Sequence, residues 1–258
     1  MTTKIKQISK AKINNPILIE GLPGIGNVGK IAADFLVDSL NAKKIYEIHS
    51  YGFPHSVFIN DENLVDLPKI EIYHKPRPKN DILIMAGDIQ PLDEKSCYEF
   101  CDAVLDILQQ HNTKEIITLG GIGLPKIPKN PKVYCTANEK PIIEKYRTKE
   151  LDSNIFGVVG PIIGVTGLLV GLASQRKIPA IAILAQTYSH PTYLGIKGAK
   201  EILDIINKKL NLKLDLEALN EEIKDIEKEV SLKSHEFEKI QKTLKKGLPQ
   251  KTDISYIG

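Results

Sequence analysis

Residues 17–29 read Ile-Leu-Ile-Glu-Gly-Leu-Pro-Gly-Ile-Gly-Asn-Val-Gly. A short apolar run, residues 17–20, passes directly into a glycine-rich loop, and a sequence with helical spacing follows over residues 28–39. This strand–loop–helix order is typical of α/β proteins, in which a buried strand is followed by a helix that crosses over the sheet. The stretch therefore predicts an α/β fold with a strand over residues 17–20.

The same alternation of apolar runs and helical patterns continues to about residue 212. It predicts parallel strands joined by crossover helices, and three polar-punctuated runs indicate antiparallel hairpin strands, so we expect a mixed, mostly parallel sheet. We expect a three-layer α/β/α core over residues 1–212. The expected strands are 17–20, 44–49, 82–86, 115–119, 155–159 and 180–185, the hairpin runs 56–60, 64–67 and 69–74, and the helices 28–39, 93–111, 141–147, 162–176 and 197–211.

The composition is that of an ordinary globular protein, with 42% hydrophobic and 26% charged residues. The net charge of +3 comes from 35 basic and 32 acidic residues that are interleaved, so no nucleic-acid partner is expected. The N-terminus lacks the apolar segment of a secretory signal, and the three cysteines, two of them Cys97 and Cys101 at helical spacing, are expected to be free thiols. We expect a cytoplasmic protein without metal or cofactor.

An uncharged stretch, residues 155–174, is about as long as a membrane-spanning helix. Glycines interrupt it, and Gly160, Gly164, Gly167 and Gly171 recur at steps of four, three and four. Such a stripe leaves one helix face as bare backbone that another element can approach closely. A buried helix in an α/β core is therefore favoured over a membrane dimerisation face, and no membrane partner is expected.

After Asp215 the pattern changes to apolar residues at steps of three and four with charges between them. This heptad pattern predicts a helical segment over residues 213–246, as one long helix or as a helical hairpin with a break near residues 231–234. Its apolar side can pack on the core of its own chain or on another protomer. Residues 247–258 are expected to form a flexible tail. The expected helix-packing residues are Leu219, Ile223, Ile226, Val230, Phe237 and Ile240.

Glycine-bearing loops follow most of the expected strands, and such loops meet at the carboxyl rim of an open α/β sheet, where ligands bind. The first loop matches the dinucleotide fingerprint G-x-G-x-x-G, but Glu47 lies in mid-strand, ahead of the place for the acidic ribose ligand. Close helix–strand packing also explains the glycines, and satisfied polar groups are favoured over catalytic ones. No catalytic residue is assigned. The residues of a possible rim ligand site are Gly24, Gly26, Asn27, Asp88, Gly121 and His190.

Four segments follow one another along the chain: residues 21–29, Gly-Leu-Pro-Gly-Ile-Gly-Asn-Val-Gly; 52–55, Gly-Phe-Pro-His; 87–91, Gly-Asp-Ile-Gln-Pro; and 120–123, Gly-Gly-Ile-Gly. Taken together and in this order, they resemble the PAC2 family, which includes archaeal homologues of proteasome assembly chaperones. The resemblance spans residues 15–212. It implies an α/β/α fold similar to nucleoside phosphorylases without a known catalytic activity, homo-oligomerisation, and binding to proteasome α subunits. The Lys- and Ile-rich composition would suit an archaeal member.

The resemblance also implies a function for the C-terminus, because members that act on the proteasome often end in a hydrophobic-Tyr-X tail that enters pockets between α subunits. Here the tyrosine is third from the end, which moves the carboxylate by about 3.5 Å relative to the ring. We expect a chaperone-like homo-oligomer that binds α subunits or the 20S particle; the alternatives are a nucleoside- or phosphate-binding enzyme or sensor and a scaffold. The expected docking residues are Ile254, Tyr256, Ile257 and Gly258.

Overall fold

The computed structural model describes residues 3–157, 159–217 and 219–221. The chain divides into two compact units, Met1–Asp215 and Leu216–Gly258. Most of the expected helical segment and the whole of the expected tail therefore lie outside the described residues. The fold described below is that of the first unit.

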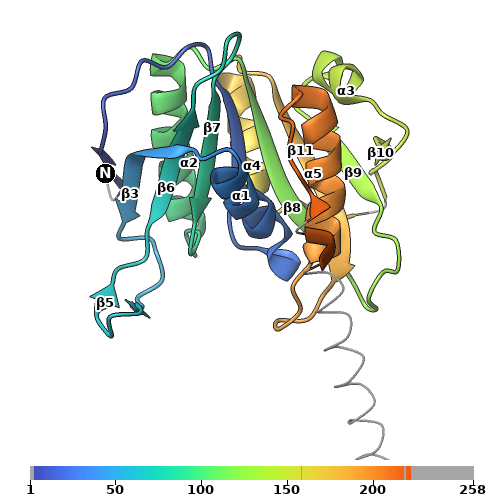
Figure 1. Cartoon of the computed structure of the whole chain (residues 1–258), viewed down its shortest axis with the longest axis horizontal. Helices are drawn as coiled ribbons and strands as arrows, with labels where there is room; N and C mark the ends of the chain where they lie inside the picture. Colours follow the sequence, from blue (N-terminus) through green and yellow to red (C-terminus); the bar gives the residue numbers. More distant parts are fainter. Residues whose placement is uncertain (1–2, 158, 218, 222–258) are drawn as a thin grey trace, which may run out of the picture. The chain divides into compact units, whose positions relative to one another are not determined.

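The first unit is built on a nine-stranded sheet with the order β1-β3-β6-β7-β2-β8-β11-β9-β10 (Figure 1). The four central strands β7, β2, β8 and β11 are parallel, whereas β1, β3 and β6 extend the sheet in antiparallel fashion on one side and β9 does so on the other. The strands are β1 Thr3–Gln7, β2 Ile17–Gly21, β3 Lys43–Ser50, β6 Ile70–Lys75, β7 Ile82–Gly87, β8 Glu115–Leu124, β9 Val133–Ala137, β10 Leu151–Asp152 and β11 Ala180–Tyr188; β4 Phe58–Ile59 and β5 Val65–Asp66 form a separate hairpin.

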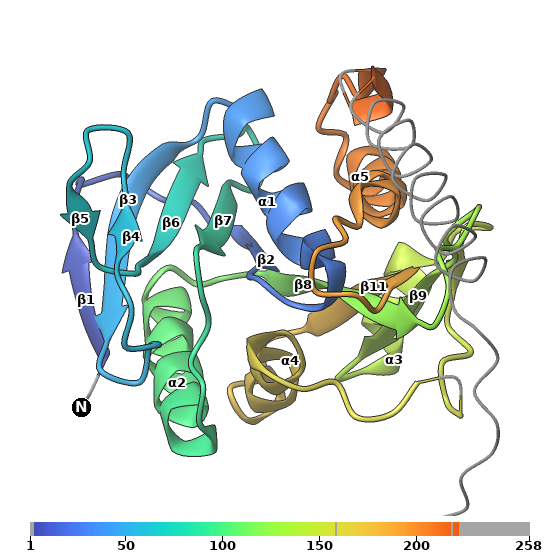
Figure 2. The ribbon, with the colours of Figure 1, turned by 90° about the horizontal axis from the view of Figure 1, so that it is seen from below.

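Helices cover both faces of this sheet (Figure 2). Helices α1 and α5 contact each other on one face, and α2 and α4 contact each other on the opposite face. This arrangement confirms the predicted three-layer α/β/α core with a mixed sheet. The helices are α1 Val28–Ser39, α2 Glu94–Gln110, α3 Lys140–Tyr146, α4 Val165–Gln175 and α5 Ile196–Leu210, and a single 3-10 turn, η1 Ile25–Asn27, precedes α1.

Burial explains why the central strands were recognisable in the sequence. Every residue of β2 and nearly every residue of β7 is buried, as in a parallel strand covered by helices on both faces. Helix α2 is amphipathic instead: Asp93 caps it by accepting a hydrogen bond from the Ser96 backbone N–H, and Cys97 and Cys101 are buried free thiols on its core side. The structure therefore confirms the expected helix, with Cys97 and Cys101 as free thiols.

The strand expected over residues 155–159 is wrong. The structure has a turn there with one isolated bridge between Phe156 and Val159, and Gly157 adopts a positive φ of 78° that breaks the extended run. Helix α4 also begins three residues later than expected, so Gly160 and Gly164 precede it. A Cβ built on Gly171 would have no neighbouring atom of the described residues within 4 Å. The C-terminal end of the glycine stripe is therefore not covered by another described element.

The short strands β1, β9 and β10 were not predicted. Strand β1, Thr-Lys-Ile-Lys-Gln, lies at the edge of the sheet with most of its side chains exposed, so it lacks the apolar signal of the central strands. Strand β10 has only two residues. Tertiary pairing, rather than local sequence preference, makes these segments strands.

A buried carboxylate joins three segments at the amino edge of the sheet. Asp81 Oδ2 lies 2.8 Å from His74 Nε2 and accepts the Asn14 backbone N–H, while Oδ1 accepts the Arg77 backbone N–H. Burial alone would raise the pKa of Asp81, but the hydrogen bonds from Arg77, His74 and Asn14 outweigh it and hold the pKa below its ordinary value. The ionised form of Asp81 therefore stabilises the fold.

We expect Asp81→Asn to lower the free energy of unfolding by about 2 kcal/mol at pH 7, because buried donors lose their charged acceptor. A carboxyl with a depressed pKa contributes stability above its unfolded pKa, near 3.8, and loses it as the pH falls through the folded pKa. The difference between wild type and variant should thus shrink below about pH 4. Urea unfolding at several pH values measures this, with the exposed Asp88→Asn as control; a difference independent of pH would contradict it.

Candidate functional site

The glycine-rich loop after β2 is held by direct contacts between backbones. A Cβ built on Gly29 would lie 2.3 Å from the Leu119 carbonyl oxygen, and one on Gly21 would lie 2.1 Å from the Gly29 carbonyl oxygen. A Cβ on Gly121 would lie 2.2 Å from the carbonyl oxygen of Ile25 in the same loop. The first turn of α1 thus lies against the carboxyl ends of β2 and β8, and close packing accounts for these three glycines.

Gln90 forms hydrogen bonds to two of the segments around this rim. It follows β7 in the Gly-Asp-Ile-Gln-Pro segment, and its Nε2 donates a 2.7 Å hydrogen bond to the Pro23 carbonyl oxygen. Its Oε1 accepts the backbone N–H of Val165 at 3.2 Å. One side-chain amide therefore connects the loop after β7, the loop after β2 and the first residue of α4.

A cavity of about 580 Å³ lies among these segments. Its wall is mostly backbone and apolar side chains, and it includes Gly24, Gly121, Leu119, Ile162 and Thr166. Two of the predicted rim residues, Gly24 and Gly121, are therefore brought together here.

The other four predicted rim residues do not line this cavity. The positive φ of Gly26 and Asn27 shapes the 3-10 turn, and the Gly26 carbonyl oxygen accepts the Gly195 backbone N–H. Asp88 is exposed, and the exposed His190 stacks on Tyr188 with ring centroids 5.5 Å apart. A carboxylate, a base and a phosphate cradle are thus not assembled around one cavity, so the geometry gives the small-ligand alternative no support.

A titratable group that the sequence interpretation missed is Glu20, at the carboxyl end of β2. The side chain is fully buried; Oε1 accepts the Leu22 backbone N–H at 3.0 Å, and Oε2 has no hydrogen-bond partner among the described residues. Burial raises the pKa of Glu20 to about 8, although the Leu22 N–H and the nearby Thr166 lower it in part. An acidic residue closing an otherwise apolar strand is the signal that could have revealed it.

A second group of exposed features lies on the α2 and α4 face. Leu92 and Ile163 are 71% and 87% exposed, and they border an open depression of about 630 Å³ that also includes Tyr98, Gly167 and Gly171. Exposed apolar side chains beside bare backbone are typical of a surface that contacts another protein rather than a polar small molecule.

The sequence model of the PAC2 family matches residues 18–232. The chain belongs to the PAC2 family. This match covers all four segments on which the resemblance depended, and the structure shows what several of them do: the glycines of residues 21–29 and 120–123 permit backbone contact, and Gln90 of residues 87–91 joins two loops.

Solved PAC2-like structures share the fold. The chain is 33% identical to Pyrococcus furiosus PbaB, described as an archaeal proteasome activator, with a TM-score of 0.83 over 91% of this chain and 100% of PbaB. It is 25% identical to P. furiosus PbaA, described as an archaeal homolog of proteasome-assembly chaperone, with a TM-score of 0.68 over 93% of this chain and 99% of PbaA. The uncharacterized protein MJ1210 of Methanocaldococcus jannaschii is 30% identical over 100% of this chain and 97% of its own length.

PbaB and PbaA are both named for a relation to the proteasome, as an activator and as an assembly-chaperone homolog, and the expectation that this chain has no catalytic residue stays a prediction. Within the part of the chain that the structure describes, His, Cys, Asp and Glu side chains form no group of three or more suited to a metal ion. The described helices include none with the length and apolarity needed to cross a membrane.

The residues expected to mediate contacts near the C-terminus remain a prediction. Of the six helix-packing residues only Leu219 lies among the described residues. The residues outside the described part are Ile223, Ile226, Val230, Phe237 and Ile240 of the heptad pattern and Ile254, Tyr256, Ile257 and Gly258 of the tail.

We expect Gly29→Ala to destabilise the protein by about 3 kcal/mol or more, because the added methyl group overlaps the Leu119 carbonyl oxygen, although alanine is the better helix former. Gly24→Ala is the matched control, since no described atom lies within 4 Å of its Cβ position and its φ of −161° suits any residue. Thermal and urea unfolding compare the two; equal stability of both variants would exclude the packing explanation.

We expect Glu20→Gln to change how stability depends on pH. The unfolded chain releases this proton near pH 4.5, whereas the folded chain keeps it to about pH 8, so the wild type loses stability as the pH rises between these values. The glutamine variant, neutral throughout, should gain about 2–4 kcal/mol relative to wild type between pH 5 and pH 8. Urea titrations across this range test the expectation, and parallel pH profiles would refute it.

Proposed function

We propose that this protein acts in the cytoplasm as a proteasome-binding chaperone, which binds proteasome α subunits or the 20S particle as a homo-oligomer. The observation that carries the proposal is the similarity to PbaB over 91% of this chain, at 33% identity and a TM-score of 0.83. PbaB is described as a proteasome activator and PbaA as an assembly-chaperone homolog, so contact with the proteasome is what the two descriptions share.

The surface of the first unit is compatible with a protein partner. The apolar side chains Leu92, Tyr98 and Ile163 are exposed on the α2 and α4 face, whereas the rim cavity is lined mainly by backbone and apolar groups without Asp88 or His190. Exposed apolar groups of this kind contribute to association when they are removed from water.

The C-terminal tail is the proposed docking element. It carries one tyrosine, Tyr256, between Ile254 and Ile257, and Gly258 follows them. A single short tail of this kind binds weakly, but several tails on one oligomer bind together with an effective concentration set by their spacing. Oligomerisation and docking therefore reinforce each other in this proposal.

We expect the intact protein to capture purified α subunits or assembled 20S particles, and deletion of residues 247–258 to weaken this capture by at least about 100-fold, because the multivalent contact is lost. Tyr256→Ala should reproduce most of the loss, and its neighbour Ser255→Ala should not. A pull-down with each target, followed by light scattering of the complex, gives affinity and stoichiometry and separates a chaperone for free subunits from a protein that binds the finished particle.

Capture that is unchanged by the deletion would exclude the tail as docking element while leaving proteasome binding in place. Failure of the folded, oligomeric protein to capture either target would exclude the proposed function itself. Light scattering of the protein alone, run in parallel, shows that the oligomer was present.

A further inference from the structure

The hairpin of β4 and β5 lies beyond the lower end of β3 and β6 in Figure 1, and its apolar side chains are exposed. Ile59 pairs with Val65 across the hairpin, and these side chains are 74% and 68% exposed. Val57 and Leu67, which flank the two strands, are exposed as well. Monomeric proteins rarely expose a continuous apolar patch of more than a few hundred Å² to water, so we expect this face to bind a partner.

The apolar face continues into a groove at the base of the hairpin. The groove has a volume of about 990 Å³, and Val57 and Leu67 form one of its walls. Strand β1 and the loop after β3 supply the remaining walls, which include Ile5, Phe53 and the strongly exposed Tyr51. Hairpin and groove therefore form one surface rather than two separate patches.

Charges of opposite sign lie at the two ends of this surface. Lys4 and Lys6 line the groove, and the Lys4 ammonium group lies 5.5 Å from the centre of the Tyr51 ring. The turn of the hairpin is acidic, with Asp61 and Glu62 exposed at its tip and Asp66 beside it on β5. The chain thus carries both halves of a complementary pair, which is the pattern expected when the partner is another copy of the same chain.

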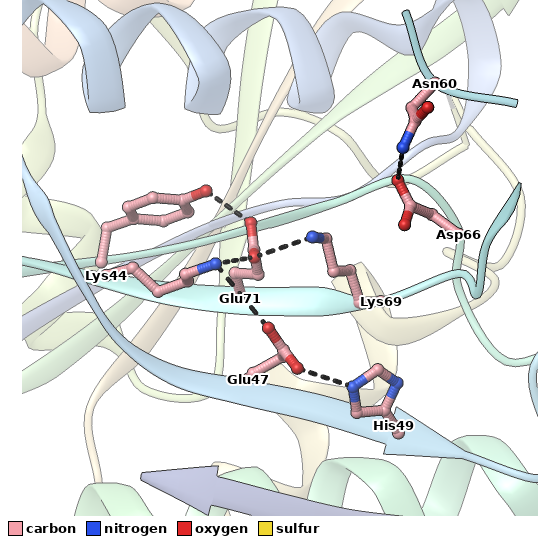
Figure 3. Close-up of polar contacts among 8 residues, drawn as sticks. Lys44, Glu47, His49, Asn60, Asp66, Lys69 and Glu71 are labelled. Atoms are coloured by element: carbon pink, nitrogen blue, oxygen red, sulfur yellow. Dashed lines mark hydrogen bonds and ion pairs between the residues drawn. The ribbon is translucent and has the colours of Figure 1, made fainter. Parts of the chain in front are cut away.

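Hydrogen bonds within the hairpin hold its turn in place without a partner. Asn60 Oδ1 accepts the backbone N–H groups of Glu62 and Leu64, and Asn60 Nδ2 donates to Asp66 Oδ2 (Figure 3). Below it, Glu71 on β6 contacts both Lys69 and Lys44, which joins the end of the hairpin connection to β3 (Figure 3). Little ordering entropy then opposes association.

We infer that the groove receives the β4–β5 hairpin of a second copy of this chain, with Asp61 and Glu62 of one copy facing Lys4 and Lys6 of the other. In a symmetric pair each copy supplies one hairpin and one groove, so every contact is made twice. The inference rests on the self-association part of the proposed function and names the surface that mediates it. It requires no contact with the proteasome.

Two charge reversals and their mixture test this interface by sedimentation velocity. Asp61→Lys/Glu62→Lys places lysines against the basic groove, and Lys4→Glu/Lys6→Glu places glutamates against the acidic turn. Each double variant alone should self-associate at least about tenfold more weakly than wild type, since like charges then face each other. An equimolar mixture of the two should recover association, because each hairpin then meets a groove of opposite charge.

Lys126→Glu/Lys129→Glu, on the exposed loop after β8, is the matched control for a change of four charge units and should keep the wild-type mass. Thermal unfolding of every variant shows that the fold is intact. The inference is overturned by a monomeric wild type, by variants that keep the wild-type mass, or by a mixture that stays dissociated. Sedimentation is measured without proteasome, so a failure here is distinct from a failure of proteasome capture, which is measured separately with the same variants.

Discussion

Three backbone segments touch without an intervening side chain where β2 ends, α1 begins and β8 passes beside them. Glycine at positions 21, 29 and 121 is what permits this contact, because any Cβ there would overlap a carbonyl oxygen. The contact sets how closely α1 packs on the sheet, and two of its glycines, Gly29 and Gly121, form part of the wall of the rim cavity. Gln90 forms hydrogen bonds to the Pro23 carbonyl oxygen and to the first residue of α4. The loop that leads into α1 and the start of α4 are therefore connected next to this contact.

Two buried carboxylates, Asp81 just before the start of β7 and Glu20 near the end of β2, show how hydrogen bonds determine the protonation state of a buried group. Asp81 accepts hydrogen bonds from two backbone N–H groups and contacts His74, and it remains ionised despite burial. Glu20 accepts one backbone N–H and leaves Oε2 without a partner among the described residues, and it holds its proton to about pH 8. The fold therefore favours the anion at Asp81 and the neutral acid at Glu20.

Local sequence was sufficient where burial is uniform. Residues 28–39 form α1 with the predicted bounds, and the central strands match because they are continuous apolar runs. It failed where long-range pairing decides: β1 is polar and exists through its ladder with β3, and residues 155–159 are apolar but turn at Gly157. The rim hypothesis placed Gly24 and Gly121 together, but it could not foresee that Asp88 and His190 lie away from the cavity, because side-chain direction at loop ends is set by packing.

The β4–β5 hairpin lies in the connection between β3 and β6, and those two strands form their own antiparallel ladder. Changes in the length or composition of this connection consequently leave the register of the main sheet untouched. With the inferred interface, sequence changes confined to this hairpin alter association between copies and leave the paired strands β3 and β6 as they are. It is also a natural place for grafting a foreign recognition loop onto this scaffold.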